Sequence, residues 1–184
     1  MNLFTYGTSK LRKVFEQQGF EFDDEITQYK NPVNRILKYI DKNTCLLLIH
    51  NVYSSEEDVE RVSDTNVNTT WVLCPNSNLY IEKTLPPVTM LYNKAQNIAI
   101  GTDSLSSNTN ISMIEELKTL NTNFPHISIN NLFQWATLGG AKALKIDAKY
   151  GSFKIGKYPG VVLIENFDFE NIRLLPQSTA KKLV

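Results

Sequence analysis

The segment Cys45-Leu46-Leu47-Leu48-Ile49-His50 places five apolar residues in a row directly before a histidine. A short continuous apolar run of this kind is typical of a strand that is buried on both faces, as in a parallel sheet. Residues 70–74 (TWVLC) and 97–100 (NIAI) have a similar composition. These three segments therefore predict strands of one buried parallel sheet.

Helical patterns alternate with these strands. Ser55 and the acidic residues that follow it predict a helix to about Asp64, because they supply an N-cap and a negatively charged first turn. Other helices are expected at residues 8–18, 33–40, 86–95, 112–120 and 128–144, and residues 78–81 could form a very short additional strand. Strands that alternate with helices of this length predict βαβ units and an α/β fold.

The pattern changes after Lys145. Residues 150–157 and 161–164 are expected to be short strands with glycine turns and no helix between them. We therefore predict two parts, with residues 1–147 forming the α/β part and residues 148–184 forming a separate small β piece and tail.

Composition excludes several classes of protein. Nineteen basic and nineteen acidic residues among 184 give no net charge, which argues against a nucleic-acid partner. No apolar run approaches the ~20 residues needed to span a bilayer, and no signal pattern is visible at the N-terminus, so we expect no membrane partner and a cytoplasmic location. Cys45 and Cys74 lie in apolar runs and are expected to be reduced thiols.

Two ionisable residues end apolar strands. His50 follows the first strand and Asp103 follows 98–102, and strand carboxyl ends are where a (β/α) barrel collects its chemistry. A histidine at this place could instead be a hydrogen-bonded core residue, and an aspartate after Gly-Thr could be a helix cap. His126 is expected in a surface loop, and the chain contains no CxxC, HxH or HExxH motif.

Several segments, taken in order, resemble one enzyme family. They are residues 48–51 (LIHN), 73–79 (LCPNSNL), 101–108 (GTDSLSSN), 113–116 (MIEE), 136–144 (ATLGGAKAL) and 151–164 (GSFKIGKYPGVVLI). Their order and spacing are similar to the amidohydrolase superfamily, in the group of cytosine deaminases, chlorohydrolases and adenosylhomocysteine deaminases. The resemblance covers about residues 45–165.

This resemblance implies the carboxyl-terminal part of a (β/α)8 TIM barrel, about strands 6–8 with their helices, plus the closing strands of a small β-sandwich. Asp103 would be the eighth-strand aspartate that binds a divalent metal, zinc or iron, and takes a proton from water. His50 would be the sixth-strand histidine that stabilises the tetrahedral intermediate. Asn78, Ser107 and Asn108 would contact a small-molecule substrate, an amino-substituted heterocycle whose C–N bond is hydrolysed.

The sequence also departs from the family. The HxH pair and the His-x-x-Glu motif that supply its other metal ligands are absent, Leu73 stands where many relatives have histidine, and 159–160 (PG) replaces Ala-Asp. We therefore expect the chain alone to bind metal weakly or not at all and to be inactive, with a missing N-terminal half or a second copy as partner. The alternative is a non-catalytic, degenerate half-barrel that serves as a binding or structural module.

Overall fold

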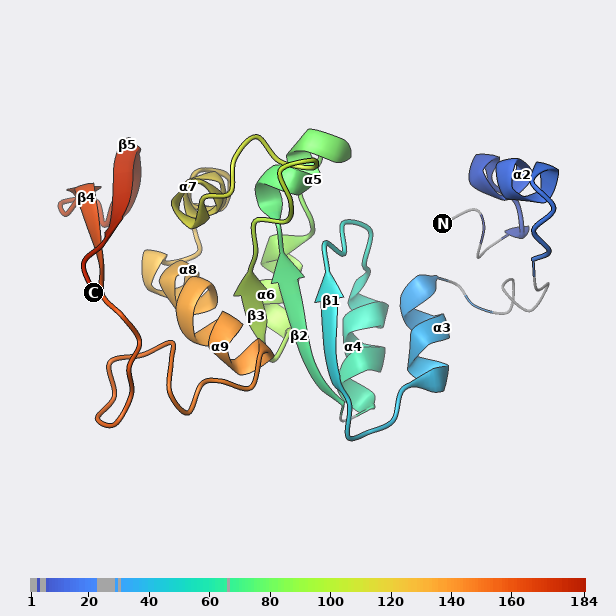
Figure 1. The fold of residues 1–184 in the computed structure, drawn as a ribbon, viewed down its shortest axis with the longest axis horizontal. Helices are drawn as coiled ribbons and strands as arrows, with labels where there is room; N and C mark the ends of the chain where they lie inside the picture. Colours follow the sequence, from blue (N-terminus) through green and yellow to red (C-terminus); the bar gives the residue numbers. More distant parts are fainter. Residues whose placement is uncertain (1–2, 4–5, 23–28, 30, 66) are drawn as a thin grey trace.

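The computed structural model describes residues 3, 6–22, 29, 31–65 and 67–184. Its centre is a parallel sheet of three strands in the order β1-β2-β3 (Figure 1). The strands are β1 (Cys45–Ile49), β2 (Asn68–Leu73) and β3 (Ile98–Ile100). The predicted parallel sheet and α/β class are confirmed, whereas the closed barrel and the sandwich stay predictions.

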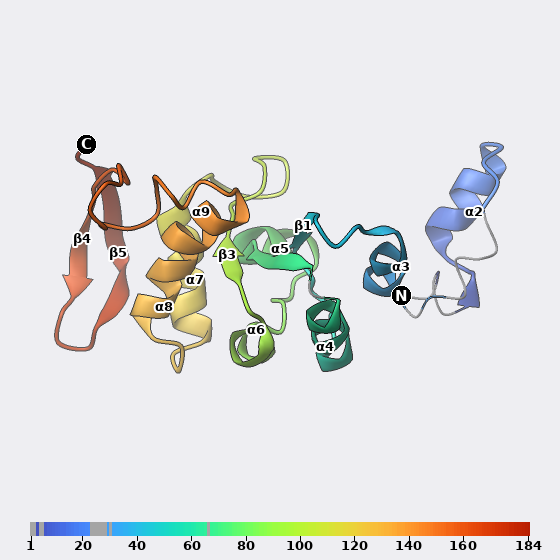
Figure 2. The ribbon, with the colours of Figure 1, turned by 90° about the horizontal axis from the view of Figure 1, so that it is seen from below.

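One face of this sheet is covered by α4 (Glu56–Asp64) and α6 (Val88–Lys94), which lie together on the same side in Figure 2. In the register of the sheet Leu48 pairs with Trp71, and Trp71 pairs with Ile98. These three side chains belong to the buried core, which continues into both helices. The predicted boundaries of α4 are confirmed, with Ser55 and Asp58 forming a capping box.

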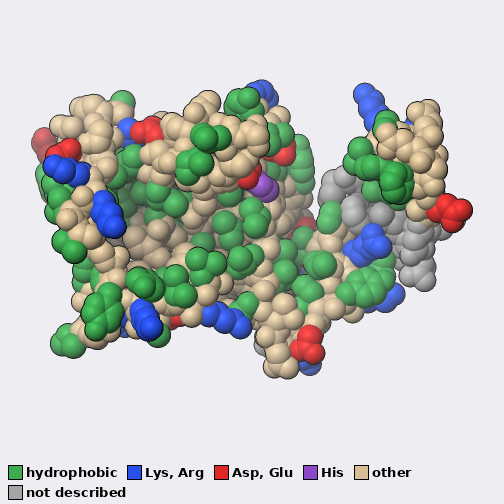
Figure 3. Space-filling model, in the orientation of Figure 1, with side chains coloured by type: hydrophobic (Ala, Val, Ile, Leu, Met, Phe, Trp, Pro, Cys, Tyr) green, Lys and Arg blue, Asp and Glu red, His purple; other side chains and the backbone are tan. Residues whose placement is uncertain are grey.

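The other face of the sheet is open beside β1. Side chains alternate along a strand, so Leu47 and Ile49 point away from the covered face, and they are 37% and 51% exposed. Figure 3 shows hydrophobic side chains gathered on the side opposite α4 and α6. The apolar composition of β1 predicts burial on both faces. That prediction was wrong for β1, because one of its faces is exposed in the structure.

The N-terminal segments are helical as expected. Helix α2 (Lys10–Gln17) begins at Ser9 and contains no buried residue, and it lies apart from the sheet in Figure 1. Helix α3 (Pro32–Tyr39) begins at Asn31, whose Oδ1 accepts the Asn34 N–H at 2.9 Å. The Asn31 amide also donates to Asp58 at 2.5 Å, which ties the start of α3 to the start of α4.

Residues 78–81 are not a strand. They belong to helix α5 (Pro75–Ile81), so that prediction was wrong. Pro75 occupies the first turn, where a proline favours helix, and the Asn78 N–H donates to Cys74 O at 3.0 Å. Leu79, Tyr80 and Ile81 are substantially exposed, so they lack the burial that a central strand would give them.

The helix predicted at residues 128–144 forms with an irregularity in the middle. It consists of α8 (Ile129–Gln134), the π-helical turn η2 (Trp135–Gly139) and α9 (Gly140–Ala143). The preceding helix α7 (Met113–Asn123) is slightly longer than predicted. Gly139 lies against β3, where a Cβ atom would stand 2.2 Å from Ile98 O.

The carboxyl-terminal region forms an antiparallel hairpin of β4 (Val162–Asp168) and β5 (Arg173–Lys182). The strand predicted at residues 161–164 is confirmed in part. The strand predicted at 150–157 is wrong, because Gly151 and Gly156 have φ values of +83° and +85° within a series of turns. β5 was not anticipated.

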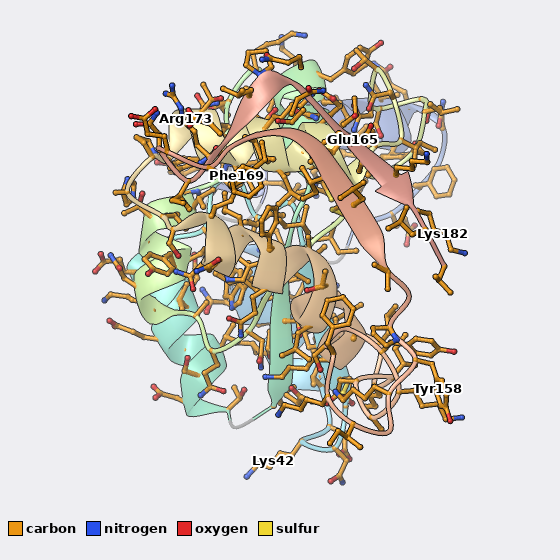
Figure 4. The ribbon with its side chains drawn as sticks, turned by 90° about the vertical axis from the view of Figure 1, so that its left-hand side faces the viewer. Lys42, Tyr158, Glu165, Phe169, Arg173 and Lys182 are labelled. Carbon is orange, nitrogen blue, oxygen red and sulfur yellow. The ribbon has the colours of Figure 1, made fainter. Side chains whose placement is uncertain are left out.

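The hairpin is a separate sheet but packs against the helices, as Figure 4 shows from its outer side. The Leu174 N–H donates to Asn121 Oδ1 at 2.9 Å, and Lys118 Nζ donates to Pro176 O at 2.7 Å. The rings of Phe133 and Phe167 are 6.4 Å apart. Among the described residues, no helix is long and apolar enough to cross a membrane.

We predict opposite effects of alanine at two adjacent glycines. Gly139→Ala should destabilise the protein by roughly 1–3 kcal/mol, because the new methyl group would collide with the Ile98 carbonyl of the central sheet. Gly140→Ala should be neutral or stabilise it by up to about 1 kcal/mol, because a Cβ there meets nothing within 4 Å and alanine favours helix. Urea unfolding of both variants checks this, and equal effects would contradict the close approach of helix and strand.

Candidate functional site

The candidate site lies at the carboxyl-terminal edge of the parallel sheet. The His50 N–H donates to Val72 O at 3.0 Å, and the Gly101 N–H donates to Leu73 O at 2.9 Å, so the hydrogen-bonding pattern continues past the ends of β1 and β3. These bonds fix the backbone directly beside His50 and Asp103. The structure thus brings the two predicted residues to the same edge of the sheet.

Their side chains face each other. His50 Nε2 is 3.7 Å from Asp103 Oδ2, with the side chains 37% and 31% exposed. Both residues have left-handed backbone, with φ values of 70° and 59°. Residues other than glycine pay conformational energy for this region, and such strain concentrates at functional sites. The imidazole and the carboxylate therefore face each other at a place that solvent or a ligand can reach.

Two serine hydroxyls hold the Asp103 carboxylate. Ser107 Oγ donates to Asp103 Oδ2 at 2.6 Å, and Ser77 Oγ donates to the same oxygen at 2.8 Å. These bonds stabilise the anion, and they are the main reason why the pKa of Asp103 lies below its usual value. Asp103 is accordingly a carboxylate at neutral pH and can accept a proton.

Asn78 contacts the other member of the pair. It is fully buried in α5, and its Nδ2 lies 3.2 Å from His50 Nδ1. The structure thus places Asn78 behind the imidazole, on the side away from Asp103. Its predicted contact with substrate is not tested by this geometry and stays a prediction, as it does for Ser107 and Asn108.

A buried carboxylate braces the loop that carries Asp103. Asn108 Nδ2 donates to Thr102 O and to Glu116 Oε1, both at 2.7 Å, while Glu116 Oε2 accepts the Asn76 N–H at 2.9 Å. Burial raises the pKa of Glu116, and these hydrogen bonds oppose the rise. Glu116 thereby joins α7, the start of α5 and the loop after β3.

Sequence reasoning did not single out Ser77 or Glu116. Both lie in segments that carry the family resemblance, 73–79 and 113–116, and that was the available signal. Neither residue interrupts an apolar strand, which was the feature used to select His50 and Asp103. Their roles depend on contacts 26 and 40 residues away in the sequence.

The structure also places the other residues that the sequence analysis considered, namely Leu73, Cys74 and His126. Leu73 is 1% exposed and belongs to the core. Cys74 is a free thiol whose pKa is raised to about 12, first by burial and then by the charges of Glu116 and Asp103. It is therefore protonated at neutral pH and is neither a nucleophile nor a thiolate ligand. His126 is exposed, as expected.

The pair by itself does not make a complete metal site. A catalytic zinc site uses three or more protein ligands. Within the described residues, no group of three or more histidine, cysteine, aspartate or glutamate side chains could hold a metal ion.

The chain is similar to known proteins of one enzyme family. A model of the amidohydrolase family matches residues 21–181. A 5-methylthioadenosine/S-adenosylhomocysteine deaminase from Thermoanaerobacter pseudethanolicus is 34% identical over 123 residues, which is 63% of this chain and 28% of that protein. A 5′-deoxyadenosine deaminase from Methanobrevibacter smithii is 30% identical over 138 residues, 71% of this chain and 31% of that protein.

A solved structure is also similar. The crystal structure of an adenosine deaminase from Xanthomonas campestris with bound zinc has a TM-score of 0.63 and 25% sequence identity. The match covers 84% of this chain and 39% of that one. The chain thus spans about a third of the length of the curated relatives that it matches.

We predict that Ser107→Ala raises the pKa of Asp103 toward the ordinary value of 3.8, because it removes the strongest bond to the anion. A lowered carboxyl pKa stabilises the fold above the unfolded-state pKa, and this contribution is lost as the pH falls through the folded-state pKa. The variant should therefore lose part of that stabilisation at neutral pH. Carbon-13 NMR titration of the carboxyl group measures the shift. Ser106→Ala is the control, since Ser106 hydrogen-bonds the Ser104 hydroxyl instead; an equal effect of both variants would contradict the assignment.

We predict that Asn108→Asp destabilises the protein by roughly 2–4 kcal/mol, because it replaces two donated hydrogen bonds by a carboxylate facing Thr102 O and the buried Glu116. Asn110→Asp makes the same change at an exposed position of the same loop and should alter stability by less than about 0.5 kcal/mol. Thermal unfolding of the two variants compares them. A mild effect of Asn108→Asp would show that Glu116 does not brace this loop.

Proposed function

The chain belongs to the amidohydrolase family, and we propose that it supplies the carboxyl-terminal part of an active site that deaminates an amino-substituted heterocycle. The observation that carries this proposal is the facing pair of His50 and Asp103 at 3.7 Å, held on strained backbone at the end of a parallel sheet. The matched relatives support the substrate class, because they are named as deaminases of adenosine-type compounds.

The proposed reaction is hydrolytic. Water adds to the ring carbon that bears the amino group. One proton of the water ends on the amino nitrogen, which leaves as ammonia, and the other ends on the adjacent ring nitrogen, so a carbonyl group remains at that carbon. Asp103 suits the role of proton acceptor, because two serine hydroxyls keep it anionic. The His50 imidazole, facing the same space, suits the stabilisation of the oxygen that has added to the ring.

We propose that Asp103 is a ligand for a divalent metal, zinc or iron. Such an ion, when bound, makes water a better nucleophile by lowering its pKa to roughly 7. Because the described residues offer an incomplete set of ligands, the others would have to come from another part of the barrel. The proton transfer proposed above is assigned to Asp103 and not to the metal.

The sheet itself supports completion by further strands. Leu47 and Ile49 are exposed apolar residues on the face of β1 that points away from α4. β1 is also an edge strand of the described sheet. Further strands that continued this sheet toward a closed barrel would pair with the free edge of β1 and enclose its exposed apolar face. We propose that an N-terminal half of the barrel occupies this side and brings the missing ligands, which a second copy of the same sequence would not carry.

We predict that the chain alone binds zinc weakly and releases no ammonia from 5′-deoxyadenosine, adenosine or S-adenosylhomocysteine. Activity should appear when the chain is co-expressed with the N-terminal part of the Thermoanaerobacter relative, because that part would supply the remaining ligands. Elemental analysis of bound metal and an ammonia assay are the measurements.

Two aspartate variants complete this experiment. In the active assembly Asp103→Asn should lower kcat by about 100-fold or more, since a proton acceptor is lost. Asp64→Asn, at an exposed position of α4, should leave kcat unchanged. Tight stoichiometric zinc and turnover by the chain alone would overturn the proposed completion. A folded assembly that binds these nucleosides without turnover would instead support the non-catalytic module.

A further inference from the structure

Asn78 has surroundings that suit a role behind the histidine rather than against a substrate. We propose that Asn78 is a positioning residue that fixes the tautomer of His50, with the proton on Nε2. The side chain is fully buried, and its Nδ2 lies 3.2 Å from His50 Nδ1. This inference rests on the proposed function for its catalytic meaning, although the tautomer can be measured without any activity.

The orientation of the Asn78 amide follows from its second neighbour. Nδ2 also lies 3.5 Å from a carboxylate oxygen of Glu82, one turn further along the helix. An amide NH2 group has two protons and can donate one to each neighbour. The flipped amide would direct its carbonyl oxygen at the Glu82 carboxylate, which is repulsive. The geometry therefore favours donation from Asn78 to His50 Nδ1.

Donation to Nδ1 has a consequence on the opposite side of the ring. A neutral imidazole has one protonated nitrogen, so Nδ1 as acceptor leaves the proton on Nε2. Nε2 is the atom that faces Asp103 Oδ2 at 3.7 Å. His50 thereby presents an N–H donor to the space beside Asp103, which suits binding of an oxygen that develops negative charge.

The carbonyl oxygen of Asn78 supports the same interpretation. It is buried and, among the described residues, has no hydrogen-bond partner. A buried polar atom without a partner is unfavourable and rare in proteins. Leucine would fill similar space without this cost, so the side chain is best explained by what its NH2 group does. That group contacts His50 and Glu82.

The test is nitrogen-15 NMR of the imidazole rings in the full chain. The chain has two histidines, His50 and His126, so the signals can be assigned with one His126→Gln variant. For neutral His50 we expect a protonated Nε2 and an unprotonated Nδ1. Asn78→Asp should reverse this tautomer, because the introduced carboxylate accepts a hydrogen bond and would draw the proton to Nδ1.

Asn51→Asp is the matched control. It introduces the same charge next to His50 in sequence, at a residue whose side chain contacts Ser54, and it should leave the tautomer unchanged. The dispersion of the backbone amide signals reports whether each variant is folded. A wild-type His50 protonated on Nδ1, or an unchanged tautomer in folded Asn78→Asp, would overturn the proposal. If Asn78→Asp does not fold, the wild-type tautomer still decides.

Kinetics of the active assembly provide a separate readout. Loss of a residue that orients another commonly lowers activity by about 10- to 100-fold. For Asn78→Asp we expect this loss in kcat with little change in KM. A raised KM with unchanged kcat would show that Asn78 binds substrate instead. Should the assembly have no activity at all, the proposed function fails while the tautomer measurement remains valid for His50.

Discussion

Parallel pairing of β1, β2 and β3 places the carboxyl ends of these strands along one edge, and the candidate site depends on this constraint. His50 and Asp103 are far apart in the sequence, yet His50 directly follows β1 and Asp103 lies three residues beyond the end of β3. The apolar side chains that hold the sheet against α4 and α6 therefore also determine where two polar residues meet. Packing energy supports the site, because the sheet cannot shift its register without separating the pair.

Helix α5 supplies side chains that contact both His50 and Asp103 at this edge. Consecutive helix residues point in different directions, and Ser77 and Asn78 use this difference to reach different members of the pair. Ser77 contacts the carboxylate of Asp103, while Asn78 contacts the imidazole of His50. Pro75 begins the helix only two residues after the last residue of β2, so Ser77 and Asn78 lie in its first turn, close to the edge of the sheet.

Features that depend on local sequence were predictable. The apolar strands, the Ser55 cap and the polar residues at the ends of β1 and β3 follow from neighbouring residues, and the structure contains all of them. The π-helical turn at Gly139 and the strand β5 depend on what packs against them, namely β3 and α7. Glu116 illustrates the same limit within the site, because its burial results from contacts with Asn76 and Asn108.

The surroundings of three ionisable groups near the sheet edge shift their pKa values in different directions. Cys74 and Glu116 are buried, and burial raises the pKa of both. Asp103 is partly exposed and receives two hydroxyl donors, which lower its pKa. Environments that separate pKa values in this way assign different roles to neighbouring groups. Because the Cys74 thiol is uncharged and Glu116 is enclosed by its hydrogen-bond donors, Asp103 is the accessible negative charge among these three. It lies where the His50 imidazole faces it, which is why the proposed proton chemistry is assigned to that pair.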